Sequence, residues 1–348
     1  MSKQAKAVAL ISGGLDSMLA VRAMQEQGVY IEGINFFTGF CVEGHTHAIR
    51  KQDQKKQKRN NALWVAEQLG IKLHIIDVID EYKDVLINPK HGYGANLNPC
   101  LDCKTFMVGK AMEWLKENDF DFIITGEVVG QRPMSQRRDT MNIVTRDSGA
   151  GELLVRPLCG KNLPATKAEQ EGWIERDKMY DFNGRSRKPQ MALAKAYGFD
   201  DYAQPAGGCC FLTDESYSKK LVDLWQVQGH KDYEFDDVML LKVGRHIRPR
   251  PHFKLIVGRE EGENRFMEGY KKRFAYLYCT SHPGPLVLVD GEQLNQADIE
   301  LAARITARFG QAKNAAEAVV HYVTPDGTEK PYTIAPLSSD DLPQEWYI

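Results

Sequence analysis

Six residues near the N-terminus, SGGLDS at positions 12–17, combine two glycines, two hydroxyls and a carboxylate in one short stretch. They follow an apolar run at 7–11 that is typical of a buried strand, and they lead into an amphipathic helical pattern. A glycine turn at such a junction leaves backbone N–H groups open at the helix N-terminus, where the helix dipole adds partial positive charge. Ser12 and Ser17 supply hydroxyl donors, and the Asp16 carboxylate suits Mg²⁺ held against an anion. The stretch therefore predicts a phosphate site, although glycine turns alone are common in α/β proteins.

Cysteines form a second set of reactive side chains. NPCLDC at 98–103 gives Cys100 and Cys103 a C-x-x-C spacing at the mouth of a loop, where two thiolates reach one metal ion or each other. Cys209 and Cys210 lie in a glycine-rich turn, QPAGGCCFLTD, and because adjacent side chains diverge we expect one metal ligand from this pair. Three thiolates with one open position suit a [4Fe–4S] cluster better than a closed zinc site.

The remaining cysteines are predicted to be core residues, because Cys41, Cys159 and Cys279 lie in or near apolar segments. The stretch CVEGHTH adds His45 and His47 to Cys41 at a loose metal spacing, which is more often a polar loop.

Whole-chain properties limit the class of protein. The chain has 348 residues, so more than one domain is expected, and its formal net charge of −2 excludes a globally basic nucleic-acid binder. We find no apolar run long enough for a bilayer and no secretory signal, so we expect a cytoplasmic protein without a membrane partner. Seven cysteines without dense spacing indicate packing, metal or catalytic thiols rather than bridges.

Alternating patterns define the elements that must position these side chains. Strands are predicted at 6–12, 30–37, 72–79 and 120–126, with helices at 17–28, 60–70 and 105–118 between them. This alternation predicts an α/β fold with a doubly wound parallel sheet, followed by a C-terminal α+β domain. Ligands bind beyond the carboxyl ends of such strands, where the SGGLDS stretch and Gly126 both fall.

Three domains are expected: the parallel α/β domain at 1–160, a helical, cysteine-bearing extension at 161–234, and the α+β domain at 235–348. The last boundary follows the change to strand and turn patterns near Phe235.

SGGLDS resembles the SGGxDS signature of the PP-loop ATP pyrophosphatases (adenine nucleotide alpha hydrolase-like), in which the loop grips the pyrophosphate of ATP. ITGEVVGQRPMSQ at 124–136 and LVRPL at 154–158 resemble segments of the tRNA 4-thiouridine synthases. Together with PCxxC and a later cysteine, they resemble the iron–sulfur type of tRNA thiolase, which is also found among 2-thiouridine synthases. The resemblance covers about residues 5–214.

The resemblance implies roles for individual residues. ATP and Mg²⁺ would be bound by the loop, namely Ser12, Gly13, Gly14, Asp16 and Ser17. Gly126 and Gln131 would lie beside the nucleotide, and Phe36 would border the adenine. Cys100, Cys103 and one of Cys209 and Cys210 would hold the cluster; we favour Cys210, because CFLTD fits the family pattern better.

A second resemblance lies near the C-terminus. FKLIVGREEGENRF and the HPGPLVLV stretch, within 252–323, are similar to the NFACT-R RNA-binding domain. The thiolases usually carry an N-terminal THUMP domain for RNA, so we expect this C-terminal domain to bind RNA here. Candidate phosphate contacts are Arg245, Arg248, Arg250, Arg259, Lys271, Lys272 and Arg273, and candidate stacking residues are Phe274, Tyr276 and Tyr278. The basic run RKQDQKKQKRN at 50–60 is a further candidate, although most such residues and runs are simply solvated.

The sequence therefore predicts an ATP-dependent tRNA sulfurtransferase that adenylates a uridine and replaces its carbonyl oxygen with sulfur, giving 4-thiouridine, AMP and pyrophosphate. Catalysis is assigned to Asp16, Cys100, Cys103 and Cys210, either through the cluster or through a persulfide on Cys210. In the persulfide route, Cys100 or Cys103 releases the product by forming a disulfide. Expected partners are tRNA, a sulfur donor (free sulfide or a cysteine desulfurase) and a second copy of the chain. The alternatives are a tRNA 2-thiouridine synthase, a PP-loop amide-forming ligase with a zinc site, and a non-enzymatic RNA-binding adaptor.

Overall fold

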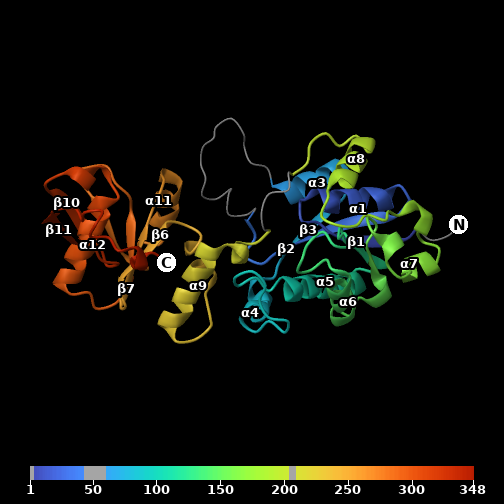
Figure 1. Cartoon of the computed structure of the whole chain (residues 1–348), viewed down its shortest axis with the longest axis horizontal. Helices are drawn as coiled ribbons and strands as arrows, with labels where there is room; N and C mark the ends of the chain where they lie inside the picture. The colour runs from blue at the N-terminus through green and yellow to red at the C-terminus, as the bar shows by residue number, and fades with distance from the viewer. Residues whose placement is uncertain (1–3, 43–59, 204–208) are drawn as a thin grey trace. The chain divides into compact units, whose positions relative to one another are not determined.

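The computed structural model describes residues 4–42, 60–203 and 209–348, which form two compact units. Unit 1 holds the described residues up to Thr213, and unit 2 begins at Asp214 (Figure 1). His45, His47 and nearly all of the basic run at 50–60 lie outside the described residues.

Unit 1 is built on a five-stranded sheet in the order β3-β2-β1-β4-β5. Every adjacent pair of strands is parallel. The strands are β1 (Lys6–Leu10), β2 (Tyr30–Phe37), β3 (Leu73–Asp77), β4 (Phe122–Ile124) and β5 (Leu154–Val155). The predicted doubly wound parallel sheet is confirmed. The sequence did not predict β5, because two residues are too short for a periodic pattern.

Helices cover both faces of this sheet, as Figure 1 shows. Alternate residues of β1 point to opposite faces: Ala7 and Ala9 pack toward α1, α3 and α8, whereas Val8 packs toward α5 and α6. The helices of unit 1 are α1 (Leu15–Gln25), α3 (Asn61–Leu69), α4 (Ile79–Ile87), α5 (Cys100–Glu117), α6 (Arg138–Asp147), α7 (Lys167–Gln170) and α8 (Lys188–Ala196).

The centre of the sheet fixes the place of the site. β1 lies between β2 and β4. At such a position the connections that follow neighbouring strands run to opposite sides of the sheet, and a crevice opens between them at the carboxyl ends of the strands. The segments that follow these strands, at 11–14, 38–41 and 125–131, all begin at this edge.

One local prediction was wrong. The sequence placed the C-x-x-C pair at the mouth of a loop and started the helix at residue 105, but α5 starts at Cys100, so both cysteines lie in its first turn. Pro99 is the N-cap of this helix, and the Cys103 N–H already donates to the Pro99 carbonyl at 2.8 Å.

Unit 2 is an antiparallel sheet with helices on both faces, which confirms the α+β prediction. The strand order is β11-β10-β8-β9-β7-β6. α12 packs on one face, and α10 and α11 pack on the other (Figure 1). The strands are β6 (Arg245–Arg250), β7 (Phe253–Val257), β8 (Ala275–Cys279), β9 (Val287–Gly291), β10 (Ala318–Val323) and β11 (Glu329–Ile334). The helices are α9 (Glu215–Gln228), α10 (Phe235–Leu240), α11 (Glu261–Glu268) and α12 (Gln296–Arg308).

The division between the units falls at residue 214, whereas the sequence placed a domain boundary near Phe235. Helix α9 accounts for the difference, because its side chains bind the elements that follow it. The Tyr217 hydroxyl donates to the Val238 carbonyl at 3.0 Å, and Arg248 donates two hydrogen bonds to Asp223 at 2.6 and 2.8 Å.

None of the described helices combines the length and the apolar composition that a membrane span requires.

The close approach of the loop after β4 to α1 provides a test of this fold. A Cβ on Gly126 would lie 2.4 Å from the carbonyl carbon of Asp16 and 2.5 Å from the Ser17 nitrogen, both backbone atoms. We expect Gly126→Ala to lower the free energy of unfolding by roughly 1–3 kcal/mol through overpacking, as measured by urea denaturation.

Gly109→Ala is the matched control, because Gly109 lies inside α5 and a Cβ there would meet its nearest atom at 3.8 Å. We expect it to raise stability by about 0.5–1 kcal/mol. A Gly126→Ala protein as stable as the Gly109→Ala protein would show that the loop after β4 does not touch α1.

Candidate nucleotide and sulfur site

The loop after β1 presents the N-terminus of α1 with few side chains in the way. Gly14 is the N-cap, no described side chain caps the helix there, and Gly14 pairs with Ala203 in an isolated parallel bridge. The first-turn N–H groups of α1 that this bridge leaves unbonded are available to an anion in the crevice. Gly13 has a φ of +76°, and a Cβ on it would lie 2.7–2.9 Å from atoms of Asn61 and Ala62 at the start of α3. Only glycine therefore fits this turn. Ser12 is exposed, whereas the buried Ser17 hydroxyl donates to the Gly14 carbonyl at 2.8 Å.

Asp16 is the carboxylate of this loop, and one of its oxygens is unpartnered. Its Oδ2 accepts a 2.6 Å hydrogen bond from Gln131 Nε2 and lies 3.7 Å from Arg187. Its Oδ1 is buried and has no hydrogen-bond partner among the described residues. Burial raises the pKa of Asp16, against the lowering effects of Arg187, Gln131 and Arg132. An unpartnered carboxylate oxygen beside a helix N-terminus is a fitting ligand for Mg²⁺.

The polar contacts of Asp16 continue into residues that the sequence did not assign to the site. Gln131 Oε1 accepts a 2.9 Å hydrogen bond from Gln190, which is fully buried on α8. Arg187 precedes the same helix, within a stretch whose basic residues are the only signal in the sequence. Side chains from three segments far apart in the chain thus meet at one carboxylate.

A buried ion pair holds the loop after β4. Glu127 is 2% exposed and accepts hydrogen bonds of 2.9 Å from both Arg156 and Thr125, with Lys104 at 3.9 Å. Burial would raise the pKa of Glu127, but Lys104 and Arg156 hold it below its ordinary value. Because this carboxylate is ionised and bound from two directions, the backbone of Gly126 beside it is fixed against α1.

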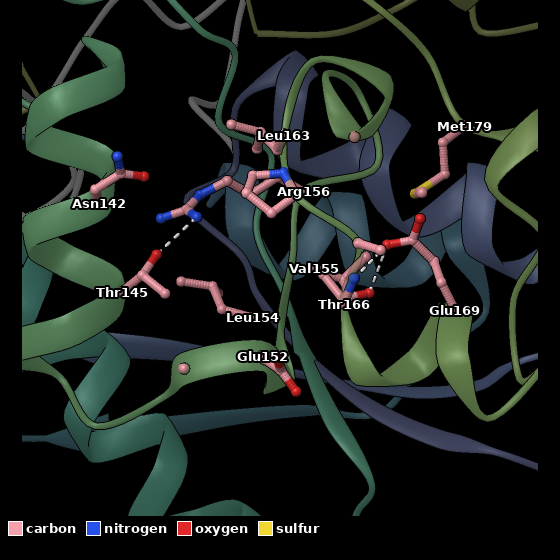
Figure 2. Close-up of a pocket in the computed structure, with 14 residues that line it drawn as sticks. Asn142, Thr145, Glu152, Leu154, Val155, Arg156, Leu163, Thr166, Glu169 and Met179 are labelled. Carbon is pink, nitrogen blue, oxygen red and sulfur yellow. Dashed lines mark hydrogen bonds between the residues drawn. The ribbon is translucent and has the colours of Figure 1, made fainter.

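Arg156 also lines the pocket shown in Figure 2, a cavity of about 260 Å³ between α6 and the 163–169 segment. There its guanidinium bonds the Thr145 hydroxyl at 2.9 Å. The pocket therefore lies behind the Glu127 ion pair rather than at the α1 N-terminus.

Five cysteines gather at the same edge of unit 1. Electrostatic interactions connect Cys103 with all four of the others, and Cys210 with three. The group, called the cysteine group below, comprises Cys41, Cys100, Cys103, Cys209 and Cys210. Tyr82 of α4 is 1% exposed, and its hydroxyl hydrogen-bonds the Cys103 thiol. Arg132 connects the group with the loop, because it lies 3.8 Å from the Cys209 sulfur and acts on Asp16.

Burial disfavours the thiolate form of two members of the group, Cys103 and Cys210. Burial raises the pKa of Cys103 to about 12 and raises that of Cys210 well above its ordinary value. Within the described part of the chain, no three Cys, His, Asp or Glu side chains are placed to share one metal ion. This arrangement does not support the predicted [4Fe–4S] cluster on Cys100, Cys103 and Cys210 with Cys209 as the alternative ligand, so we derive no step through a cluster.

The prediction that Cys41 is a core residue was wrong. Cys41 is only partly buried and pairs with Cys210 in an isolated antiparallel bridge. The sequence signal was present, since Cys41 closely follows the strand at 30–37, but its apolar neighbours favoured the core. Cys159 is fully buried and Cys279 packs against the core of unit 2, as predicted.

Phe36 is 6% exposed and packs in the core on the α5 face, beside Val8 and Leu101. Its adenine contact stays a prediction.

In unit 2, carboxylates partner most of the predicted phosphate contacts. Arg248 is bonded to Asp223, Arg259 to Glu263, and Arg273 to Asp237; Arg250 lies 3.5 Å from Asp298 and Lys271 3.9 Å from Glu268. Arg245 lies over the Phe309 ring, and Lys272 is exposed. An RNA phosphate would have to compete with these carboxylates, so the basic residues form a weaker site than their number suggests.

Two of the three aromatic candidates, Tyr276 and Tyr278, form a row on β8, whereas Phe274 precedes the strand and packs against the core of unit 2. The rings of Tyr276 and Tyr278 stack with centroids 6.2 Å apart, and His321 of β10 lies 5.5 Å from Tyr278. Lys271 sits over Tyr276 at 4.8 Å. A row of half-exposed rings beside a cation is the kind of surface on which unpaired bases stack.

Models of two known domain families match different parts of the chain. Residues 5–147 match the model of the tRNA methyl transferase HUP domain, and residues 244–347 match that of the NFACT protein RNA binding domain. The two matches thus lie on separate parts of the chain, the described residues of the first within unit 1 and the second within unit 2.

Curated relatives match about a third of the chain. Proteins named tRNA-specific 2-thiouridylase MnmA are 30% identical over 128 residues in Campylobacter curvus, 31% over 127 in Pelobacter propionicus and 32% over 120 in Akkermansia muciniphila. These matches cover 36%, 35% and 33% of this chain, and 35%, 33% and 32% of the relatives. The chain thus spans about a third of the length of the relatives it matches.

The Glu127–Arg156 pair generates a stability prediction. Arg156→Met leaves a buried carboxylate without its main partner, so we expect the free energy of unfolding at pH 7 to fall by roughly 3–5 kcal/mol in urea denaturation. A carboxyl group whose pKa is depressed in the fold stabilises it above the pKa of the unfolded chain, and this contribution disappears as the pH falls. The difference between variant and wild type should therefore shrink once acid protonates Glu127.

The control is Arg146→Met, which removes an arginine that is 71% exposed and paired with Asp147. We expect this change to cost less than about 1 kcal/mol at every pH. Equal losses for the two variants would contradict the role given to the buried pair.

Proposed function

We propose that this protein is an ATP-dependent enzyme that replaces a carbonyl oxygen of a tRNA uridine with sulfur. The observation that carries the proposal is the meeting, at one sheet edge, of the unpartnered Asp16 oxygen, the open N-terminus of α1 and the cysteine group. The HUP match and the relatives named tRNA 2-thiouridylase support the same class of reaction.

The loop residues hold the nucleotide in this proposal. The first-turn N–H groups of α1 and the Ser12 hydroxyl bind the pyrophosphate oxygens of ATP, and Gln131 orients Asp16. Mg²⁺ on Asp16 neutralises phosphate charge when bound. Because Gly126 carries no side chain, the loop after β4 lies close enough for Gln131 to reach the nucleotide pocket.

The reaction has two displacement steps. The uridine carbonyl oxygen attacks the α-phosphorus of ATP and releases pyrophosphate, which gives an adenylated base. Sulfide then adds to the same carbon, and AMP leaves with the former carbonyl oxygen. Adenylation is needed because oxide is a poor leaving group. The cysteine group, which Arg132 connects with Asp16, supplies the sulfur in the form of a Cys210 persulfide.

The relatives favour C2 of uridine as the carbon that is modified, because their names specify 2-thiouridine. The segment at 124–136 favoured C4 in the sequence analysis. We therefore propose 2-thiouridine as the product in place of the predicted 4-thiouridine. Unit 2 binds the tRNA in this proposal, a cysteine desulfurase or free sulfide donates sulfur, and the cytoplasm is the expected location.

Asp16→Asn tests the first step. We expect the variant to lose at least about 100-fold in uridine-dependent pyrophosphate release, since the charge that holds Mg²⁺ is gone. Nucleoside mass spectrometry of tRNA from cells that lack the gene should show the loss of 2-thiouridine, restored by the wild type and not by Asp16→Asn.

Glu26→Gln is the matched control, because Glu26 lies at the opposite end of α1 in an exposed ion pair with Arg22. It should restore thiolation fully. Loss of 4-thiouridine would reassign the carbon, and unchanged thionucleosides would contradict the proposal.

Tyr278→Ala tests the role of unit 2. We expect the variant to lose roughly 1–3 kcal/mol of binding free energy for a tRNA transcript per stacked base, measured by filter binding. Tyr30→Ala removes an exposed tyrosine of unit 1 and serves as the control. If both variants bind tRNA like the wild type, the aromatic row is not the RNA surface.

A further inference from the structure

Cys41 and Cys210 stand directly opposite each other in unit 1. They form an isolated antiparallel bridge between the segment after β2 and the segment that ends unit 1. Two hydrogen bonds flank the pair: Val42 N–H donates to the Cys209 carbonyl at 3.3 Å, and Phe211 N–H donates to the Phe40 carbonyl at 3.0 Å.

This pattern identifies a non-hydrogen-bonded antiparallel pair, because the bonds join the residues on either side of the cysteines and not the cysteines themselves. In such pairs the two Cα atoms lie about 4.5 Å apart and both side chains leave the same face. A disulfide accepts Cα separations of about 4.4–6.8 Å. The two sulfurs can therefore bond with little movement of the backbone.

The pair is also held firmly. Phe40 and Leu212, which flank it, are 1% and 0% exposed, and the Leu212 N–H donates to the Cys210 sulfur at 3.4 Å. On the other side, the Thr38 hydroxyl lies 3.7 Å from the Cys41 sulfur. Successive side chains of an extended segment point to opposite sides, so Cys210 faces Cys41 while Cys209 is exposed near Arg132.

Cys103 is the main competing thiol of the cysteine group, since it also interacts electrostatically with Cys210. Cys103 is hydrogen-bonded to Tyr82 in the first turn of α5, and its N–H is bound to Pro99. Two backbone hydrogen bonds set the register of Cys41 opposite Cys210.

We propose that Cys41 is the thiol that releases sulfur from a persulfide on Cys210, through a Cys41–Cys210 disulfide. This inference rests on the proposed function for the source and the fate of the sulfur. The Cys41 sulfur attacks Cys210 Sγ, the bond between Cys210 Sγ and the outer sulfur breaks, and the outer sulfur leaves as HS⁻, with the Cys41 proton passing to solvent. The outer sulfur is reduced by two electrons, and the two cysteine sulfurs are oxidised to the disulfide.

The released HS⁻ is the nucleophile that adds to the adenylated uridine. A dithiol reductant of the thioredoxin class then returns both cysteines to thiols, and a cysteine desulfurase renews the persulfide.

The first experiment needs no substitution and no tRNA. The full-length reduced protein is treated with a thiol oxidant, alkylated and digested, and its disulfides are mapped by mass spectrometry. We expect the peptide pair that contains Cys41 and Cys210. A map that joins Cys210 to Cys100 or Cys103, with Cys41 alkylated, overturns the proposal.

The second experiment follows the sulfur. The protein is loaded with ³⁵S from a cysteine desulfurase and labelled cysteine, then freed of the donor, and released sulfide is trapped and counted. We expect Cys41→Ser to release sulfide at least about tenfold more slowly than the wild type and to keep the label on Cys210. Cys279→Ser, in unit 2, is the matched control and should release sulfide at the wild-type rate.

Release at the wild-type rate from Cys41→Ser overturns the proposal, as does anaerobically prepared protein in which bound iron shields Cys41 and Cys210 from alkylation. These readouts are independent of thionucleoside formation. If the protein forms the disulfide and releases sulfide but leaves tRNA unchanged, the result contradicts the proposed function and still supports the role of the Cys41–Cys210 pair.

Discussion

The site depends on one close contact between two backbones. The loop after β4 lies against the first turn of α1 at Gly126, where a Cβ would come within 2.4 Å of the Asp16 carbonyl carbon. This contact brings Gln131 to Asp16, and through Gln131 it brings α8. It is held from behind by Glu127, whose buried charge is matched by Arg156 and Lys104. The buried ion pair thus positions the loop after β4, whose Gln131 faces Asp16.

The cysteine group follows from the same parallel sheet. Because all five strands run in one direction, the segments after β1, β2 and β4 begin at one edge. The segment after β2 continues far enough to pair with the residues that end unit 1, and α4 supplies Tyr82 next to Cys103. Nucleotide and sulfur chemistry can share this edge because the sheet topology directs three loops to it.

Unit 2 makes a different use of charge. Its arginines are largely paired with carboxylates, so its surface carries less net positive charge than the sequence runs suggest, in agreement with the formal charge of −2 for the whole chain. The aromatic row on β8 keeps its ring faces beside Lys271. Stacking is less sensitive than ion pairing to neighbouring carboxylates, which makes these rings the stronger candidates for contact with bases.

The sequence by itself determined the parallel α/β unit, the antiparallel unit after it and the glycine loop, because hydrophobic periodicity and glycine turns are local signals. It also singled out Asp16, Cys100, Cys103 and Cys210 from their spacing and resemblance. Only the tertiary structure decided that α5 begins at Cys100, that Arg187 and Gln190 reach the Asp16 site, and that Cys41 faces Cys210. The start of α5 depends on the cap at Pro99, which the apolar pattern does not mark. The other two facts depend on strand order and on contacts between residues more than 50 positions apart, and local patterns of apolar and polar residues do not specify which distant segments meet.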